Sequence, residues 1–163
     1  MDIFRPTWAE IDLKAFRHNL AALQGRLSPK TKILAVLKAN AYGHGAVALA
    51  RTAAALKGFP LAGFGVSSVE EGLALREAGL KTPVLILGSL YPFLSFEAAL
   101  RRGLTPTVSS RGAALTLARV ARRLKTRVSF HLKVDTGMGR IGVRPQAVEG
   151  LLAGVAARPE LDL

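Results

Sequence analysis

Apolar and polar positions along the chain alternate with two different periods, which predicts a regular succession of strands and helices. Short apolar runs typical of buried parallel strands occur at 32–37, 63–66, 84–87, 104–108 and 128–134. Segments with apolar residues at helical spacing lie around them, at 16–27, 46–57, 67–78, 94–102, 112–124 and 145–157.

The repeated strand–helix unit predicts an α/β protein whose parallel sheet is covered by helices, as either a barrel or a doubly wound sheet. About five core strands are expected, with residues 161–163 as the start of a sixth. Before them, residues 8–13 alternate between apolar and polar side chains and predict a separate N-terminal strand. Asp12 is placed to cap the helix that follows.

The composition excludes several classes of protein. The chain has 163 residues, of which 50% are hydrophobic and 21% charged, so it can form a buried core and is not disordered. It has no Cys, which excludes disulfides, thiolate metal sites and a cysteine nucleophile. Neither a signal-peptide pattern at residues 1–6 nor an apolar run of about 18 residues is present. We therefore expect a cytoplasmic protein with no membrane partner and no metal site.

The net charge of +12 raises the alternative of an anionic partner. No acidic residue occurs between Glu97 and Asp135, a stretch that contains nine Lys and Arg residues. Such a stretch could attract nucleic acid, but it also fits a solvated helix face whose acidic partners lie elsewhere. Because no aromatic residue lies between Phe96 and Phe130, there is no platform on which bases could stack. We therefore do not expect a nucleic-acid partner.

The first segment with candidate chemistry is Ala35–Gly45, which reads Ala-Val-Leu-Lys-Ala-Asn-Ala-Tyr-Gly-His-Gly. Lys38 follows a predicted buried strand, at the edge where α/β sheets and barrels carry their reactive groups. A lysine there can serve as a nucleophile or base, and the glycines after it allow close backbone approach. The alternative is a lysine that reaches solvent from a strand end, with the loop serving only as a turn.

The second segment is His131–Gly142. Strand alternation places His131, Lys133 and Asp135 on one face and apolar residues on the other. A charged face opposite an apolar face suits a strand that lines the interior of a barrel. A structural ion pair between Lys133 and Asp135 would explain the same pattern.

Residues 137–142 also have the spacing Gly-x-Gly-x-x-Gly of a dinucleotide-binding loop. The strand before them is charged, and Pro145 starts the next helix only after the third glycine, so this spacing does not favour a nucleotide such as NAD. Arg140 within the turn is suited to a carboxylate, phosphate or phenolate.

Together the two segments resemble the signatures of the alanine racemases, a family of pyridoxal-phosphate enzymes. Val36–Gly45 is similar to the cofactor-lysine motif of that family, Lys133–Gly142 to its second motif, and residues 7–13 to its opening strand. The resemblance covers essentially the whole chain. It implies a partial (β/α)8 TIM-type barrel at 14–163, preceded by an N-terminal strand at 1–13 that in the family packs on a C-terminal β-domain.

The resemblance implies roles for five residues. Lys38 would hold pyridoxal 5′-phosphate as an imine and act as the catalytic base on one face of the substrate α-carbon. Tyr42 would contact the cofactor phosphate, and Leu87 would pack near the cofactor ring. Arg140 would contact both cofactor and substrate. Lys133 matches a lysine that is often carbamylated in the family, and the resulting anion would hold Arg140.

The resemblance also implies an activity, the interconversion of L- and D-alanine, which supplies a peptidoglycan precursor, and a homodimeric full-length protein. The later barrel strands and the second catalytic base, a Tyr from the partner subunit, are absent from these 163 residues. We therefore expect this part to be inactive by itself. The alternatives are a non-catalytic pyridoxal-phosphate-binding or interaction module and, less favoured, a basic nucleic-acid-binding protein.

Overall fold

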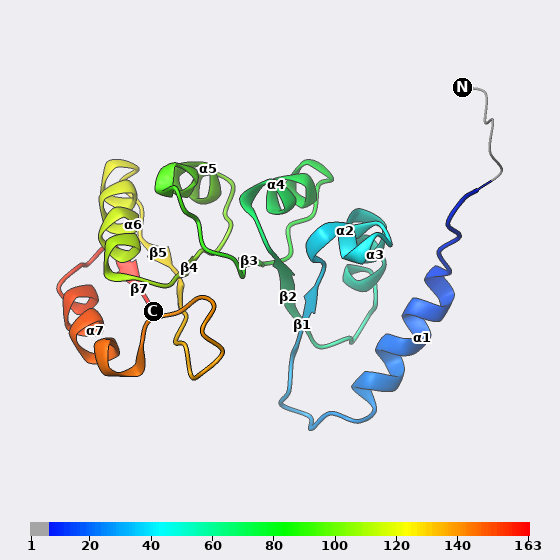
Figure 1. The fold of residues 1–163 in the computed structure, drawn as a ribbon. Helices are drawn as coiled ribbons and strands as arrows, with labels where there is room; N and C mark the ends of the chain where they lie inside the picture. Colours follow the sequence, from blue (N-terminus) through cyan, green and yellow to red (C-terminus); the bar gives the residue numbers. More distant parts are fainter. Residues whose placement is uncertain (1–6) are drawn as a thin grey trace.

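The computed structural model describes residues 7–163, and short parallel strands run through it as a curved row (Figure 1). The first three strands form one sheet in the order β1-β2-β3, while β4 pairs with β6 and β5 with β7. A bridge between Leu85 and Thr105 connects β3 to the segment that leads into β4. The strands are β1 (Ile33–Val36), β2 (Leu61–Val66), β3 (Val84–Ile86), β4 (Thr107–Val108), β5 (Val128–Ser129), β6 (His131–Leu132) and β7 (Leu161–Asp162).

The strand order decides between the two predicted architectures. β5 and β6 are two halves of one extended segment that pairs with β4 on one side and with β7 on the other. With these two counted together, the strands follow the order of the chain, and within residues 7–163 that order never reverses. A doubly wound sheet reverses its strand order at a switch point, whereas a barrel does not. The described chain is therefore arranged as part of a barrel.

Helices connect the strands, and α3, α4, α5 and α6 lie along one side of the row (Figure 1). Serine side chains cap two of them: the Ser68 hydroxyl accepts from the backbone of α4, and Ser110 does the same for α6. The helices are α1 (Leu13–Gln24), α2 (Lys38–Tyr42), α3 (Ala46–Ala54), α4 (Val69–Glu77), α5 (Phe96–Arg101), α6 (Arg111–Arg123) and α7 (Val148–Ala156), with 3₁₀ turns η1 (Phe93–Ser95) and η2 (Pro145–Ala147).

The predicted N-terminal strand is wrong for the described residues. Residues 7–12 form neither strand nor helix, Trp8 is 75% exposed, and Leu13 already belongs to α1. Asp12 caps this helix as predicted, accepting from the backbone N–H groups of Lys14 and Ala15. An alternating sequence forms a strand only when another strand pairs with its backbone, and none does so here. Residues 1–6 lie outside the described residues, so the sequence-based expectations about them are not tested.

The predicted strand at 128–134 is divided at Phe130. The first half, β5, pairs with β7, and the second half, β6, pairs with β4 on the other side. The backbone N–H of Phe130 still donates to Asp162, whereas that of His131 donates to Pro106. One extended segment thus changes its hydrogen-bonding partner halfway along its length.

The two faces of the row differ in how completely they are covered. Between strands and helices lies a core with fully buried side chains such as Phe64, Ile86 and Leu117. On the other face of β1, Leu34 and Val36 are 38% and 42% exposed. In a parallel sheet with helices on both sides, or in a closed barrel, both faces are buried. The helix-free face differs from both arrangements, because its apolar side chains on β1 stay partly exposed within residues 7–163.

No helix within residues 7–163 combines the length and the apolar character needed to cross a membrane.

Candidate active site

Lys38 lies at the carboxyl end of β1, where the backbone leaves the strand in a left-handed turn. Ala39, Asn40 and Ala41 have φ between 52° and 54°, and Tyr42 has φ of 55°. For a residue with a side chain this conformation costs about 1–2 kcal/mol. The turn brings the first two predicted site residues together, with Lys38 Nζ 5.6 Å from the centre of the Tyr42 ring.

Other residues of the same motif stabilise this turn. The side-chain oxygen of Asn40 accepts a hydrogen bond from the backbone N–H of Ala46, at 2.8 Å, at the start of α3. Asn also tolerates left-handed backbone better than most residues. Gly43 and Gly45 end the turn with φ of 86° and 88°, values that glycine adopts without steric cost. The polar loop predicted from sequence is therefore a well-defined turn, stabilised by a side-chain hydrogen bond, that begins at Lys38.

Glu71, in the first turn of α4, was not predicted as a site residue. Its Oε1 accepts the backbone N–H of Ala39 at 2.8 Å, and its Oε2 accepts that of Ser67 at 2.7 Å. The sequence signal was Ser68-x-x-Glu71, a spacing typical of a helix N-terminus. That spacing predicts a cap, but it does not predict the contact with the turn after β1, which joins residues 32 positions apart.

Lys133 follows β6, and its side chain reaches past β4 to the residue that follows β3. Its Nζ lies 3.4 Å from the carbonyl oxygen of Leu87, to which it donates. The structure thus brings Lys133 and Leu87 together. Val36 and Leu87 also flank the position of Gly65, where an added Cβ would lie 3.3 Å from Val36 and 3.0 Å from Leu87. An apolar wall therefore lies on the helix-free face next to Lys133.

The loop at 135–142 is organised by Asp135 and not by an ion pair with Lys133. Asp135 Oδ1 accepts the backbone N–H groups of Gly137 and Gly139, both at 3.0 Å. These hydrogen bonds, chiefly the one from Gly139, hold the pKa of Asp135 below its usual value. The carboxylate is thus used inside its own loop, and no ion pair with Lys133 is formed within residues 7–163.

Arg140 lies in this loop and is exposed. It forms no side-chain hydrogen bond or ion pair with the described part of the chain. The loop is followed by a 3₁₀ turn from Pro145 and only then by α7, so no helix begins at the third glycine. This arrangement does not match a dinucleotide-binding loop, whose helix N-terminus faces the phosphates. No cluster of His, Asp and Glu suited to a metal ion occurs among the described residues.

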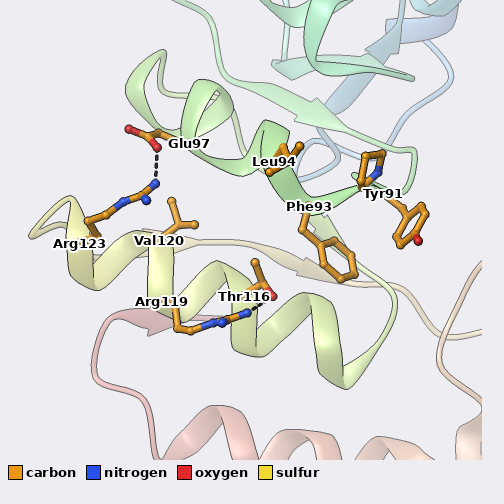
Figure 2. Close-up of a pocket in the computed structure, with 9 residues that line it drawn as sticks. Tyr91, Phe93, Leu94, Glu97, Thr116, Arg119, Val120 and Arg123 are labelled. Atoms are coloured by element: carbon orange, nitrogen blue, oxygen red, sulfur yellow. Dashed lines mark hydrogen bonds and ion pairs between the residues drawn. The ribbon is translucent and has the colours of Figure 1, made fainter.

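Four residues of the basic stretch, Arg111, Arg119, Arg122 and Arg123, lie on α6. A groove there lies between η1 and α6, with Tyr91, Phe93 and Leu94 on one wall and Thr116, Arg119 and Arg123 on the other (Figure 2). Arg123 pairs with Glu97 across this groove. The groove is thus lined by apolar side chains and by the ion pair between Arg123 and Glu97.

Several of the basic side chains have acidic partners. Arg101 donates to Glu97 at 2.8 Å, Arg122 to Glu160 at 2.8 Å and Arg127 to Asp162 at 3.3 Å. The hydrogen bond from Arg101 is the main reason that the pKa of Glu97 lies below its usual value, and Arg123 adds to the effect. These pairs favour the interpretation of the basic stretch as a solvated helix face.

Comparison with known proteins identifies the relatives of this chain. Residues 11–163 match the family described as alanine racemase, N-terminal domain. The alanine racemase of Sorangium cellulosum is 44% identical over 98% of this chain and 42% of its own length. This chain spans about two fifths of the length of the curated relatives that it matches.

Solved structures give the same result. An alanine racemase of Clostridium difficile 630 superposes with a TM-score of 0.90 and 35% identity, over 99% of this chain and 42% of that one. A histidine racemase of Leuconostoc mesenteroides superposes with a TM-score of 0.81 and 28% identity, over 91% of this chain and 39% of that one. The motifs at Lys38 and Lys133 thus lie in a chain that matches these proteins in both sequence and fold, and it belongs to the alanine racemase family.

Proposed function

We propose that this chain supplies the lysine-bearing part of a pyridoxal-phosphate-dependent racemase that interconverts L- and D-alanine. The observation that carries the proposal is the position of Lys38, whose amine lies beside the Tyr42 ring at the carboxyl end of β1. This is the edge at which barrels carry their catalytic groups. Within residues 7–163, the Lys38 amine has no hydrogen bond or ion pair that would occupy it.

The chemical character of these residues fits pyridoxal 5′-phosphate. A free primary amine can bind its aldehyde, a phenol can donate to its phosphate, and an apolar side chain can pack against its ring. Lys38, Tyr42 and Leu87 offer these three groups. When bound, the cofactor delocalises the negative charge that develops at the substrate α-carbon.

The residues would then act as follows. Lys38 would hold the cofactor through its amine and, when free, would move a proton on one face of the substrate α-carbon. Tyr42 would donate to the phosphate, and Leu87 would border the ring. Arg140, free of partners in the described chain, would contact the cofactor and the substrate.

Lys133 would hold Arg140 in that position. The unprotonated form of its amine would add carbon dioxide and lose a proton, which would leave a carbamate anion. A carbamate attracts a guanidinium as a carboxylate does. Within residues 7–163 the only hydrogen bond of the Lys133 amine goes to the Leu87 carbonyl, at 3.4 Å, a partner that it can leave at little cost.

Racemisation needs a second proton donor on the opposite face of the α-carbon, and none of the described residues at this site offers one. We infer that the 163 residues by themselves do not racemise alanine, and that the activity belongs to a longer, homodimeric, cytoplasmic protein whose partner subunit contributes the second base. Alanine is the proposed substrate because the curated relatives are alanine racemases.

The test is borohydride trapping of pyridoxal phosphate on the chain, followed by mass spectrometry of the labelled peptide. We expect label on Lys38, no label there in Lys38→Ala, and normal labelling in the control Lys32→Ala, which removes an exposed lysine just before β1. Undiminished total labelling in Lys38→Ala would refute the proposed attachment site.

A second measurement separates the proposed enzyme from a non-catalytic cofactor-binding module. D-alanine formation from L-alanine is assayed for these 163 residues and for a longer chain that continues with the remainder of a family barrel and its C-terminal domain. We expect none from the former and turnover from the latter. Label on Lys38 without turnover in either chain would support the non-catalytic module.

A further inference from the structure

Glu71 joins the ends of two neighbouring strands. Ala39, whose N–H donates to Glu71 Oε1 at 2.8 Å, is the residue directly after Lys38. Ser67, whose N–H donates to Oε2 at 2.7 Å, directly follows the last residue of β2. One half-buried carboxylate therefore connects the loop after β1 to the loop after β2 with both of its oxygens.

Capping of α4 does not explain this arrangement. In a capping box the glutamate at the third helical position reaches back to the N–H of the capping residue, which here is Ser68. Glu71 bonds instead to Ser67, one residue earlier, and its other oxygen leaves the helix to reach Ala39. The Ser68 hydroxyl meanwhile caps the helix by accepting the Glu71 N–H at 3.3 Å. Oε1 of Glu71 therefore bonds to the turn that carries Lys38 and not to its own helix.

The turn needs such a contact. Ala39 and Ala41 both have φ above 50°, where the Cβ of alanine is crowded. Asn40 holds the far side of the turn through Ala46, and Glu71 holds the near side through Ala39. A hydrogen bond from a backbone N–H to a carboxylate is stronger than one to a neutral acceptor.

We propose that Glu71 is a positioning residue for Lys38. By holding the Ala39 N–H, the carboxylate fixes the backbone conformation directly after Lys38 and so determines the direction in which the lysine amine points. The effect passes through the backbone, since Glu71 forms no hydrogen bond or ion pair with the Lys38 side chain itself. This inference rests on the proposed function only for the cofactor that Lys38 would carry. The geometry itself is independent of the cofactor.

The test compares Glu71→Gln with Glu70→Gln in the full 163-residue chain. The glutamine at position 71 keeps one acceptor oxygen and places an amide N–H₂ against the other backbone N–H, which breaks one of the two bonds. The change at Glu70 removes the same charge from the same helical turn, so it controls for the helix dipole. Thermal unfolding followed by circular dichroism gives the global stability of each variant.

Two readouts need no cofactor. Amide hydrogen exchange by NMR should become about tenfold faster at Ala39 or Ser67 in Glu71→Gln, the change expected for loss of a hydrogen bond to a charged acceptor. Acylation of Lys38 by an amine-specific reagent, measured relative to Lys32 in the same molecule, should change by about threefold or more. Both values should stay at the parent level in Glu70→Gln.

The third readout is cofactor trapping at Lys38, with the visible absorption spectrum of the adduct. We expect slower trapping and a shifted absorption maximum in Glu71→Gln. If the exchange and acylation changes occur but the parent chain traps no cofactor, the proposed function fails and the positioning role stands. Parent-like exchange and acylation in Glu71→Gln would overturn the positioning role, and so would a uniform rise in the reactivity of every lysine.

Discussion

The loop after β1 is tied to neighbouring elements, whereas the loop after β6 is closed largely on itself. In the first loop, Asn40 bonds to α3 and Glu71 reaches in from α4. In the second, Asp135 bonds to Gly137 and Gly139 of its own loop. The comparison shows that contacts from neighbouring elements of the described chain hold the turn that carries Lys38. Arg140, in contrast, lies on a loop that is held largely by its own hydrogen bonds. The Arg140 side chain has no hydrogen-bond or ion-pair partner among the described residues.

Gly142 is the position in the loop after β6 at which a substitution should disrupt the loop most strongly. At Gly142, φ is 151° and an added Cβ would lie 2.9 Å from both Cα and Cβ of Asp135. We expect Gly142→Ala to lower the free energy of unfolding by about 2–3 kcal/mol, because a backbone clash cannot be relieved by a side-chain rotation. Urea unfolding followed by circular dichroism measures this.

The control is Gly150→Ala, at an exposed helical glycine whose added Cβ meets nothing within 4 Å. It should be neutral or stabilising by up to about 1 kcal/mol. Because the two loops are anchored independently, cofactor trapping at Lys38 should survive Gly142→Ala if the barrel stays folded. Loss of trapping in a folded Gly142→Ala chain would show that the loops are coupled.

The loop after β1 should respond to Asn40→Ala with a smaller loss of stability. Removal of the bond to Ala46 should cost about 1 kcal/mol, the usual effect of losing a helix cap. The change should also slow cofactor trapping at Lys38. Asn19→Ala, at an exposed position of α1, is the matched control and should leave both measurements unchanged. Equal effects of the two substitutions would argue against a specific role of Asn40 in the turn.

Acidification should loosen the loop after β6. The pKa of Asp135 is lowered by the backbone N–H groups of Gly139 and Gly137, so the ionised carboxylate is favoured in the folded chain. Its contribution is therefore present above the unfolded-state pKa of about 4 and is lost as the pH falls through the lower folded-state pKa. Hydrogen exchange at Gly137 and Gly139 should accelerate over this range, beyond its intrinsic pH dependence. The same amides in Asp135→Asn should show no such acceleration, and an identical pH profile in both chains would contradict the assignment.

The smallest effect on stability is expected for Arg140→Ala. The side chain is exposed and has no polar partner in the described chain, so the free energy of unfolding should change by less than about 0.5 kcal/mol. Cofactor affinity, measured by equilibrium absorption titration, should fall if Arg140 contacts the cofactor as proposed. A large loss of stability would show instead that Arg140 is part of the packed structure.

Much of the fold and of the site could be predicted from local sequence. Lys38 and Tyr42 are four positions apart in one motif, so any compact turn brings them close. The strands and helices followed from hydrophobic period, and the Asp12 cap from its place before α1. The N-terminal strand failed because an alternating pattern states only that a segment is able to form a strand. Whether another strand lies beside it to pair with its backbone depends on the tertiary structure.

What the sequence determined by itself is the order of elements, the two motifs and the family, because these depend on residues near one another along the chain. The tertiary structure alone decided that the strands follow a barrel order, that Asp135 serves its own loop rather than Lys133, and that Glu71 reaches the residue after Lys38. The physical reason is that each of these depends on which backbone groups and charges meet across elements. A carboxylate in a helix N-terminus can satisfy its own helix or a neighbouring strand end, and only the folded chain shows which N–H lies within its reach.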